Sequence, residues 1–236
     1  MLDTPRKWEL RTDSTPEDRL TTANGTSLSG CRNEEERKLY PLLAQYLFDE
    51  LGIYPKTIDE RPSSDRSAEQ VQWLHPALVG LQMPSEHLCL DARDYAELSG
   101  NRRAPSRTWS FEVKVLINAA NVREAFFQAV SNSSWANLGY LVAATIEKDV
   151  RRELQTLSAA HGIGVILLDK GDLENCRRLI PAKERPSTDW GLADRLAAEN
   201  PTFRRVLQSL ALFIRSGHIT PTEWDVDVLP SASVWD

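Results

Sequence analysis

Alternating apolar and polar residues mark a strand at the centre of the chain, over residues 109–117. The apolar positions recur at every second residue: Trp109, Phe111, Val113, Val115 and Ile117. This period of two predicts a strand with one buried face, and it places Glu112 and Lys114 side by side on the opposite face. The simplest interpretation of such a pair is an ion pair on a solvated sheet surface. A carboxylate and an ammonium on a rigid strand can also bind a divalent metal together with a water or phosphate oxygen.

Similar patterns predict the other elements of an α/β fold. Two strands precede the central one, at 53–59 and 71–81, and two apolar strands follow it, at 138–146 and 163–168. The predicted helices cover 33–50, a segment beginning at Asn118 or Asn121, 148–161, 189–199 and 201–216. Strand, helix and strand over 138–168 predict a right-handed crossover between parallel strands. Pro41 either kinks the first helix or marks its true first turn, with Glu36 in an approach segment.

Composition divides the chain into three predicted parts. Residues 1–30 are polar and without sustained periodicity, which is typical of a flexible extension. Residues 31–170 carry the strands and helices of the core, and 171–236 are predicted to be a mostly helical accessory region with a tail. A chain of 236 residues can hold one sizeable domain, or one domain with a small appendage.

Charge and cysteine content narrow the class of protein. A hydrophobic content of 41% and a charged content of 26% are typical of a soluble globular protein. The net charge of −6 does not suggest bulk affinity for nucleic acid or anionic membranes, although a local basic groove is compatible with it. The three cysteines are widely separated, as expected for reduced thiols. No signal peptide or membrane-spanning run is evident, so we expect a cytoplasmic protein without a membrane partner.

Three short segments resemble a known family. They are His75-Pro-Ala-Leu-Val-Gly80, Phe111-Glu-Val-Lys-Val115 and Phe127-Gln-Ala129. In the predicted order of elements, these segments resemble the core of the PD-(D/E)XK nuclease superfamily. The central strand and the helix after it, as far as Trp135, are similar to the nuclease half of HrgA-type restriction-endonuclease-like proteins. The resemblance covers residues 33–170 and implies a restriction-endonuclease-like core (αβββαβ, a mixed sheet flanked by helices) with an added βαβ strand and C-terminal accessory helices.

The resemblance also implies a reaction, the hydrolysis of phosphodiester bonds in DNA assisted by Mg²⁺, with Mn²⁺ as an alternative ion. In the family, an acidic residue on strand two and the glutamate of strand three hold a metal that polarises the phosphate and activates the attacking water. The lysine orients that water and stabilises the charge on phosphorus. Carried over, Glu112 is a metal ligand, Lys114 is the catalytic lysine, and the main-chain carbonyl of Val113 completes the metal shell.

Two further residues match family positions that support the site. Gln128 matches a glutamine that points back at the site, and Glu36 matches the glutamate of the first helix in many members. Each has an ordinary alternative: Gln128 as a polar-face residue of its helix, and Glu36 as part of a capping pair with Asn33. Arginines around the third strand are candidate phosphate contacts, although solvated surface charge is the simpler interpretation. These arginines are Arg102, Arg103, Arg107 and Arg123.

Position 77 departs from the family pattern. Where the family carries an aspartate after His-Pro, this chain has Ala77, whose methyl group cannot bind Mg²⁺. Three explanations stay open: an engineered inactivating change, transfer of the role to another carboxylate, or a natural pseudonuclease. The candidates for such a transfer are Asp59, Asp65 and Glu36. The intact Glu112-Val-Lys114 motif argues against long decay.

Two hypotheses of function follow from the sequence. The first is a Mg²⁺-dependent DNA endonuclease of a prokaryotic restriction or anti-phage system, inactive as written if Ala77 is engineered. Such enzymes often act as homodimers or in hetero-complexes. Because no helix-turn-helix, zinc finger or basic recognition helix is evident, a partner protein is a candidate source of target recognition. The second hypothesis is an inert subunit that uses the nuclease fold to bind nucleic acid or a partner protein.

Overall fold

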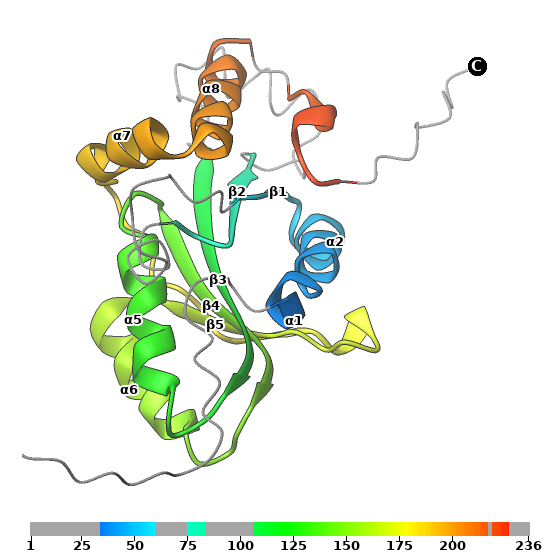
Figure 1. Ribbon diagram of the computed structural model, residues 1–236, viewed down its shortest axis with the longest axis vertical. Helices are drawn as coiled ribbons and strands as arrows, with labels where there is room; N and C mark the ends of the chain where they lie inside the picture. Colours follow the sequence, from blue (N-terminus) through cyan, green and yellow to red (C-terminus); the bar gives the residue numbers. More distant parts are fainter. Residues whose placement is uncertain (1–33, 60–74, 84–105, 217–218, 227–236) are drawn as a thin grey trace, which may run out of the picture.

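The computed structural model describes residues 34–59, 75–83, 106–216 and 219–226, and it has an α/β architecture (Figure 1). A six-stranded mixed sheet is flanked by helices. Several predictions lie outside the described residues: the extension at 1–30, the start of the strand predicted from Val71, and the loop with Arg102 and Arg103. Within the described ranges, no helix is both long enough and apolar enough to cross a membrane.

The sheet orders its strands as they occur along the chain. They are β1 (Ile53–Thr57), β2 (Leu78–Gln82), β3 (Arg107–Ile117), β4 (Leu138–Ile146), β5 (Gly164–Leu167) and β6 (Arg177–Ile180). The first three strands form an antiparallel meander, and β3, β4 and β5 are parallel. At the far edge, β6 runs antiparallel to β5. Five of the six strands therefore coincide with strands predicted from the sequence.

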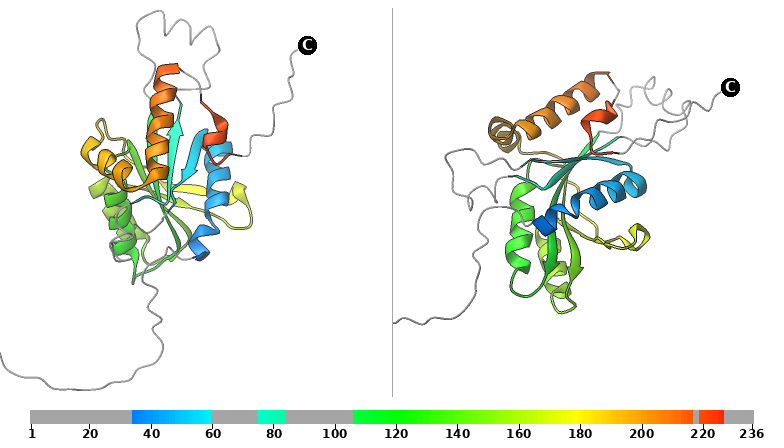
Figure 2. Two further views of the ribbon diagram at one scale, coloured as in Figure 1. Left: turned by 45° about the horizontal axis from the view of Figure 1, so that its top comes forward. Right: turned by 45° about the vertical axis from the view of Figure 1, so that its right-hand side comes forward.

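The predicted pair of parallel strands with a helix between them is confirmed. The parallel strands β4 and β5 are joined by α6 (Arg151–His161), which Gly162 ends in a left-handed conformation with φ of 74°. A glycine is required at 164, because an added Cβ would lie 2.2 Å from the Tyr140 ring. The apolar composition of β4 is explained by its central place, since helices cover the sheet on both sides (Figure 2).

The first predicted helix is interrupted. The structure has a short α1 (Glu34–Arg37), then a turn, then α2 (Tyr40–Leu51) with Pro41 in its first turn. Proline fits there because the first N–H groups of a helix have no intrahelical acceptor. Pro41 thus marks the first turn of the longer helix, and Glu36 belongs to a separate helical turn before it.

Helices bury opposite faces of the central strands. On one face, α2 packs over Trp109, Phe111 and Val113 of β3. On the other face, α5 (Val122–Asn132) and α6 pack over Leu141 and Ala143 of β4. Residues 107–117 are therefore covered on both sides along much of their length. The sequence pattern predicts that the second face of β3 is exposed to solvent. A polar side chain on that face is buried where α5 covers it.

The C-terminal elements close the end of the sheet that carries β1 and β2. The predicted helices are confirmed as α7 (Trp190–Glu199) and α8 (Pro201–Ser216), which pack with Val79 and Leu81 in a third apolar cluster (Figure 1). The prediction of a mostly helical region from Asp172 onward is wrong for β6. Its residues, Arg-Arg-Leu-Ile, lack an alternating pattern because this edge strand is largely exposed.

Candidate functional site

The candidate site lies where β3 extends beyond β2. The described β2 pairs with the first half of β3, and its register ends with Leu78 opposite Phe111. The N–H of Ala77 then donates to the Phe111 carbonyl at 2.9 Å. From Glu112 onward, β3 pairs with β4 alone among the described strands. The motif Glu112-Val-Lys114 therefore begins at the point along β3 where its edge toward β2 no longer pairs with a described strand.

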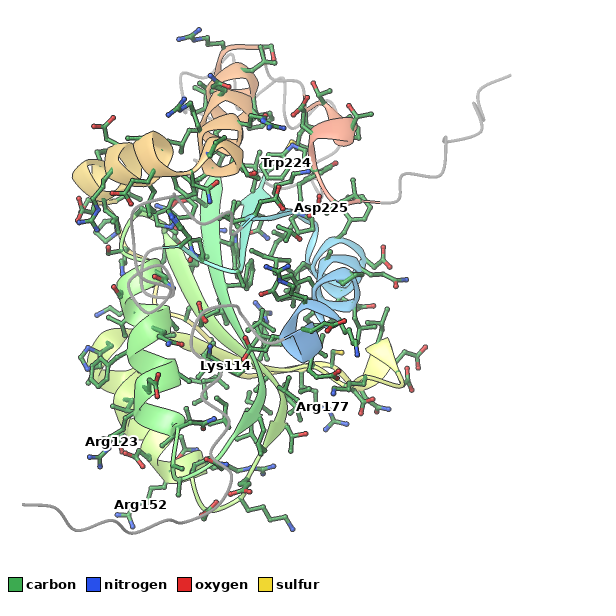
Figure 3. All side chains as sticks on the ribbon, in the orientation of Figure 1. Lys114, Arg123, Arg152, Arg177, Trp224 and Asp225 are labelled. Atoms are coloured by element: carbon green, nitrogen blue, oxygen red, sulfur yellow. The ribbon has the colours of Figure 1, made fainter. Side chains whose placement is uncertain are left out.

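Glu112 and Lys114 are buried, which excludes the interpretation as an ion pair on a solvated sheet surface. Their residues are 1% and 8% exposed, respectively. The Lys114 Nζ lies 3.1 Å from Oε1 of Glu112. In the view of Figure 3, Lys114 lies between α1 and α5. These two helices remove from solvent a face that the alternating sequence pattern leaves polar.

Glu36 is brought to the same ammonium from the other side. It is the buried residue of α1, and its Oε1 lies 3.7 Å from Lys114 Nζ. The turn between α1 and α2 makes this possible, since it lets α1 leave the axis of α2 and lie against β3. Two carboxylates from distant segments therefore face one lysine.

Gln128 lies on the buried face of α5 and is 1% exposed. No described residue donates a hydrogen bond to its Oε1, which is also shielded from solvent. The structure thus places Gln128 on the side of α5 that covers the sheet, without a hydrogen bond to Glu112 or Lys114 among the described contacts. Its proposed support of the site remains a prediction.

Asn132 is the residue of this cluster that the sequence analysis does not identify. It lies one turn after Gln128 on α5 and is 2% exposed. Its Nδ2 donates to Oε2 of Glu112 and to the carbonyl of His75, both at 3.1 Å. A lone asparagine near the end of a helix belongs to no motif. The signal was its spacing of four from Gln128, which puts both amides on one helix face.

Position 77 adds no oxygen ligand to the site. Ala77 is fully buried and belongs to the apolar cluster under α2. Of the carboxylates proposed to replace an aspartate there, Asp59 accepts from the hydroxyl of Thr202 at 3.3 Å, at the start of α8. Asp65 lies outside the described residues. Glu36 is the described candidate that reaches Lys114.

Glu112 and Glu36 are the described carboxylates at this site that could hold a metal ion. Within the described ranges, no group of three or more His, Cys, Asp and Glu side chains is arranged to hold a metal. Mg²⁺ is commonly held by one or two carboxylates, with water and substrate phosphates completing its shell. Glu112 and Glu36 supply that number. The Phe111 carbonyl points toward β2, and carbonyls alternate along a strand, so the Val113 carbonyl points toward the same edge beyond Leu78.

The two described arginines among the candidate phosphate contacts already form ion pairs. Arg107 pairs with Glu184 at 3.0 Å, and Arg123 pairs with Glu153 on the exposed side of α5. These pairs favour the interpretation as surface charge. Arg185 is different, because its Nη1 donates to the Ser133 carbonyl at 2.7 Å, just after α5. Burial lowers the pKa of the Arg185 guanidinium.

Comparisons with known proteins return no match, whether against protein-family models, curated proteins or solved structures. The class of protein therefore rests on the geometry of the site and on the resemblance of its motifs.

Proposed function

We propose that this chain has the restriction-endonuclease-like core of a metal-dependent DNA endonuclease of a prokaryotic restriction or anti-phage system, and that Ala77 weakens or abolishes its cutting. The observation that carries the proposal is the buried pair of Glu112 and Lys114, with 3.1 Å between Oε1 and Nζ, at the edge of β3 where β2 ends. The order of elements supports it: a helix, an antiparallel meander, a covering helix and a parallel strand.

The energetic cost of burying these charges supports a functional role. Removing a carboxylate or an ammonium from water costs several kcal/mol per ion, and a buried pair is often less stabilising than apolar residues of the same volume. Two carboxylates and a lysine from α1 and β3 form such a cluster. A fold that needed only stability would gain more from apolar side chains at these positions.

The chemistry of the proposed reaction assigns distinct tasks to the residues. Glu112, Glu36 and the Val113 carbonyl would hold a Mg²⁺ ion, which supplies charge stabilisation at the phosphate and a more acidic water. Lys114 has three N–H donors and lies against both carboxylates, which would hold its amino group beside the scissile phosphate. It orients the attacking water and offsets the negative charge that develops on the phosphate oxygens. Gln128 supports the site from α5.

A second function, an inert nuclease-fold subunit that binds nucleic acid or a partner protein, is favoured by position 77 itself. The Ala77 methyl group is fully buried within an apolar cluster. The chain therefore packs this position as part of its core. Under this alternative, the buried charges are what remains of a former active site, and binding is the retained activity.

The test is to restore the carboxylate with Ala77→Asp and to incubate the protein with plasmid DNA and Mg²⁺ or Mn²⁺. We expect the substitution to create metal-dependent cleavage and a higher thermal midpoint in Mn²⁺, because the new carboxylate would add a ligand for the ion to that of Glu112. Ala77→Asn is the matched control, since it has nearly the same shape without the charge.

Two outcomes separate the functions. If folded Ala77→Asp protein cuts neither DNA nor RNA and binds no metal, the endonuclease proposal fails. If that protein is inert but binds DNA with an affinity that falls steeply with salt, the binding-subunit function is favoured, because neutralised phosphates release counterions.

A further inference from the structure

One asparagine connects three parts of the site. The Asn132 side chain lies near the C-terminal end of α5 and donates from a single Nδ2 to Glu112 of β3 and to the His75 carbonyl. Both acceptors are oxygen atoms with no hydrogen to donate, so the orientation of the amide is fixed by chemistry. Asn132 thus contacts the glutamate of the motif and the segment two residues before Ala77.

Asn132 is itself held rigidly. Its main-chain carbonyl accepts from the hydroxyl of Ser110 at 2.9 Å and from the Trp135 indole at 3.0 Å. The main-chain carbonyl of the next residue, Ser133, accepts a hydrogen bond from the Arg185 guanidinium. These three bonds come from β3, from the turn after α5 and from the segment before α7. The side chain of Asn132 is therefore placed by the backbone around it.

The hydrogen bond from Asn132 gives the two carboxylate oxygens of Glu112 different partners. Asn132 occupies Oε2 at 3.1 Å, while Oε1 lies 3.1 Å from the Lys114 ammonium. The amide therefore fixes the rotation of the carboxylate and turns its other oxygen toward the lysine. The same Nδ2 also donates to the His75 carbonyl, which links the segment before Ala77 to Glu112.

We propose that Asn132 is a positioning residue that fixes the rotation of the Glu112 carboxylate and keeps its second oxygen beside Lys114, so that Glu112 is held in the orientation in which it can bind a divalent cation. This inference rests on the proposed endonuclease function. Partners that hydrogen-bond a metal-ligating group typically change metal affinity or activity by about 10- to 100-fold when they are removed. Lys114 also faces Glu112 in this structure, and Glu36 lies against the same lysine.

The first experiment uses the Ala77→Asp protein and adds Asn132→Leu, which has a similar size but no donor. We expect the affinity for Mn²⁺, measured by titration calorimetry, and the kcat for plasmid cleavage to fall by about 10- to 100-fold. The KM for DNA should be unchanged, because Asn132 is buried and contacts the carboxylate. Folded protein that keeps its Mn²⁺ affinity and kcat would overturn the proposal.

Asn132→Ser is a second variant in case leucine prevents folding, and Asn200→Ser is its matched control. Asn200 is also a buried amide whose Nδ2 donates to a main-chain carbonyl, that of Asp59, but it lies at the start of α8. Serine can retain the cap that Asn200 provides to α8. We expect Asn200→Ser to leave Mn²⁺ affinity unchanged. An equal loss of affinity in both variants would show a general effect of packing and would refute a specific role.

A second experiment needs no activity. The free energy of unfolding is measured for Asn132→Ser, for Glu112→Leu and for the double variant of the chain with Ala77. Because each single change disrupts the same hydrogen bond, the double variant should lose less than the sum of the two losses. Strict additivity would overturn the role of Asn132. If the Ala77→Asp protein binds no metal and cuts nothing, the proposed function fails, and this cycle still decides whether Asn132 orients Glu112.

Discussion

Two ion pairs of this molecule have opposite surroundings. In one, Lys114 and Glu112 have side chains that are 10% and 0% exposed, and Glu36 approaches the same lysine. In the other, Arg123 and Glu153 join α5 to α6 with side chains that are 78% and 32% exposed. Figure 3 places Arg123 toward the outer end of α5, away from Lys114. An exposed pair contributes little to stability, whereas a buried one is strongly coupled to its surroundings.

The difference between the buried and the exposed ion pair indicates which charged residues of this chain to regard as functional. Exposed pairs are common on any surface and carry no information about activity. The buried cluster is costly, and it is assembled from segments almost eighty residues apart, in α1 and β3. Three substitutions can sharpen or break this contrast.

The largest effect is expected for Lys114→Met. The change leaves the Glu112 carboxylate buried without its cation, which should lower the free energy of unfolding by about 3–5 kcal/mol. Urea unfolding measures it, and Lys148→Met, at an exposed lysine, is the control. Adding Glu112→Gln should recover part of the loss, because the uncompensated charge is then removed. If Lys114→Met alone is as stable as the unsubstituted chain, the predicted difference between the buried and the exposed ion pair is wrong.

A smaller effect is expected for Glu36→Gln. Its Oε1 is farther from Lys114 than that of Glu112, 3.7 Å against 3.1 Å, so the loss of charge should cost about 1 kcal/mol. Thermal unfolding measures it, with Glu34→Gln on the exposed side of α1 as control. In the Ala77→Asp protein, the same change should reduce Mn²⁺ affinity. If affinity is unchanged, Glu36 is a structural partner of Lys114 and not a metal ligand.

The smallest effect is expected for Arg123→Ala. Its guanidinium is exposed, and its pKa is raised by the hydrogen bond with Glu153. Since solvent and salt screen this pair, the thermal midpoint should not change within error. Cleavage by the Ala77→Asp protein measures a possible contact with DNA. A clear increase in the KM for DNA would show that Arg123 binds phosphate and would overturn its assignment as surface charge.

The sequence predicted most of the fold because its strong patterns are also its buried ones. The apolar strands β4 and β5 and the helix between them appear where periodicity places them. The short strand β6 was not predicted, because three of its four residues are exposed and its pairing is long-range. The separate α1 was one of two alternatives raised by Pro41. Local pattern cannot decide between them, because the position of Glu36 depends on β3.

The candidate site was predictable only in part. The motif residues Glu112 and Lys114 were found, but alternation left them on a polar face, and their burial depends on helices that pack from elsewhere in the chain. Asn132 was not found at all. Its role arises from two acceptors that are twenty and fifty-seven residues away, and no single segment of sequence carries such a contact.

The two margins of the sheet have a consequence for self-association. An unpaired margin can template another strand, and proteins prevent this with proline, charge or very short strands. At one margin, β1 carries Pro55 and Lys56 within five residues. At the other, β6 has four residues, of which Arg177 and Arg178 are exposed. Neither edge strand offers a long, regular row of unpaired backbone groups to a neighbouring chain. The described part of the molecule therefore resists fibrous aggregation through its sheet.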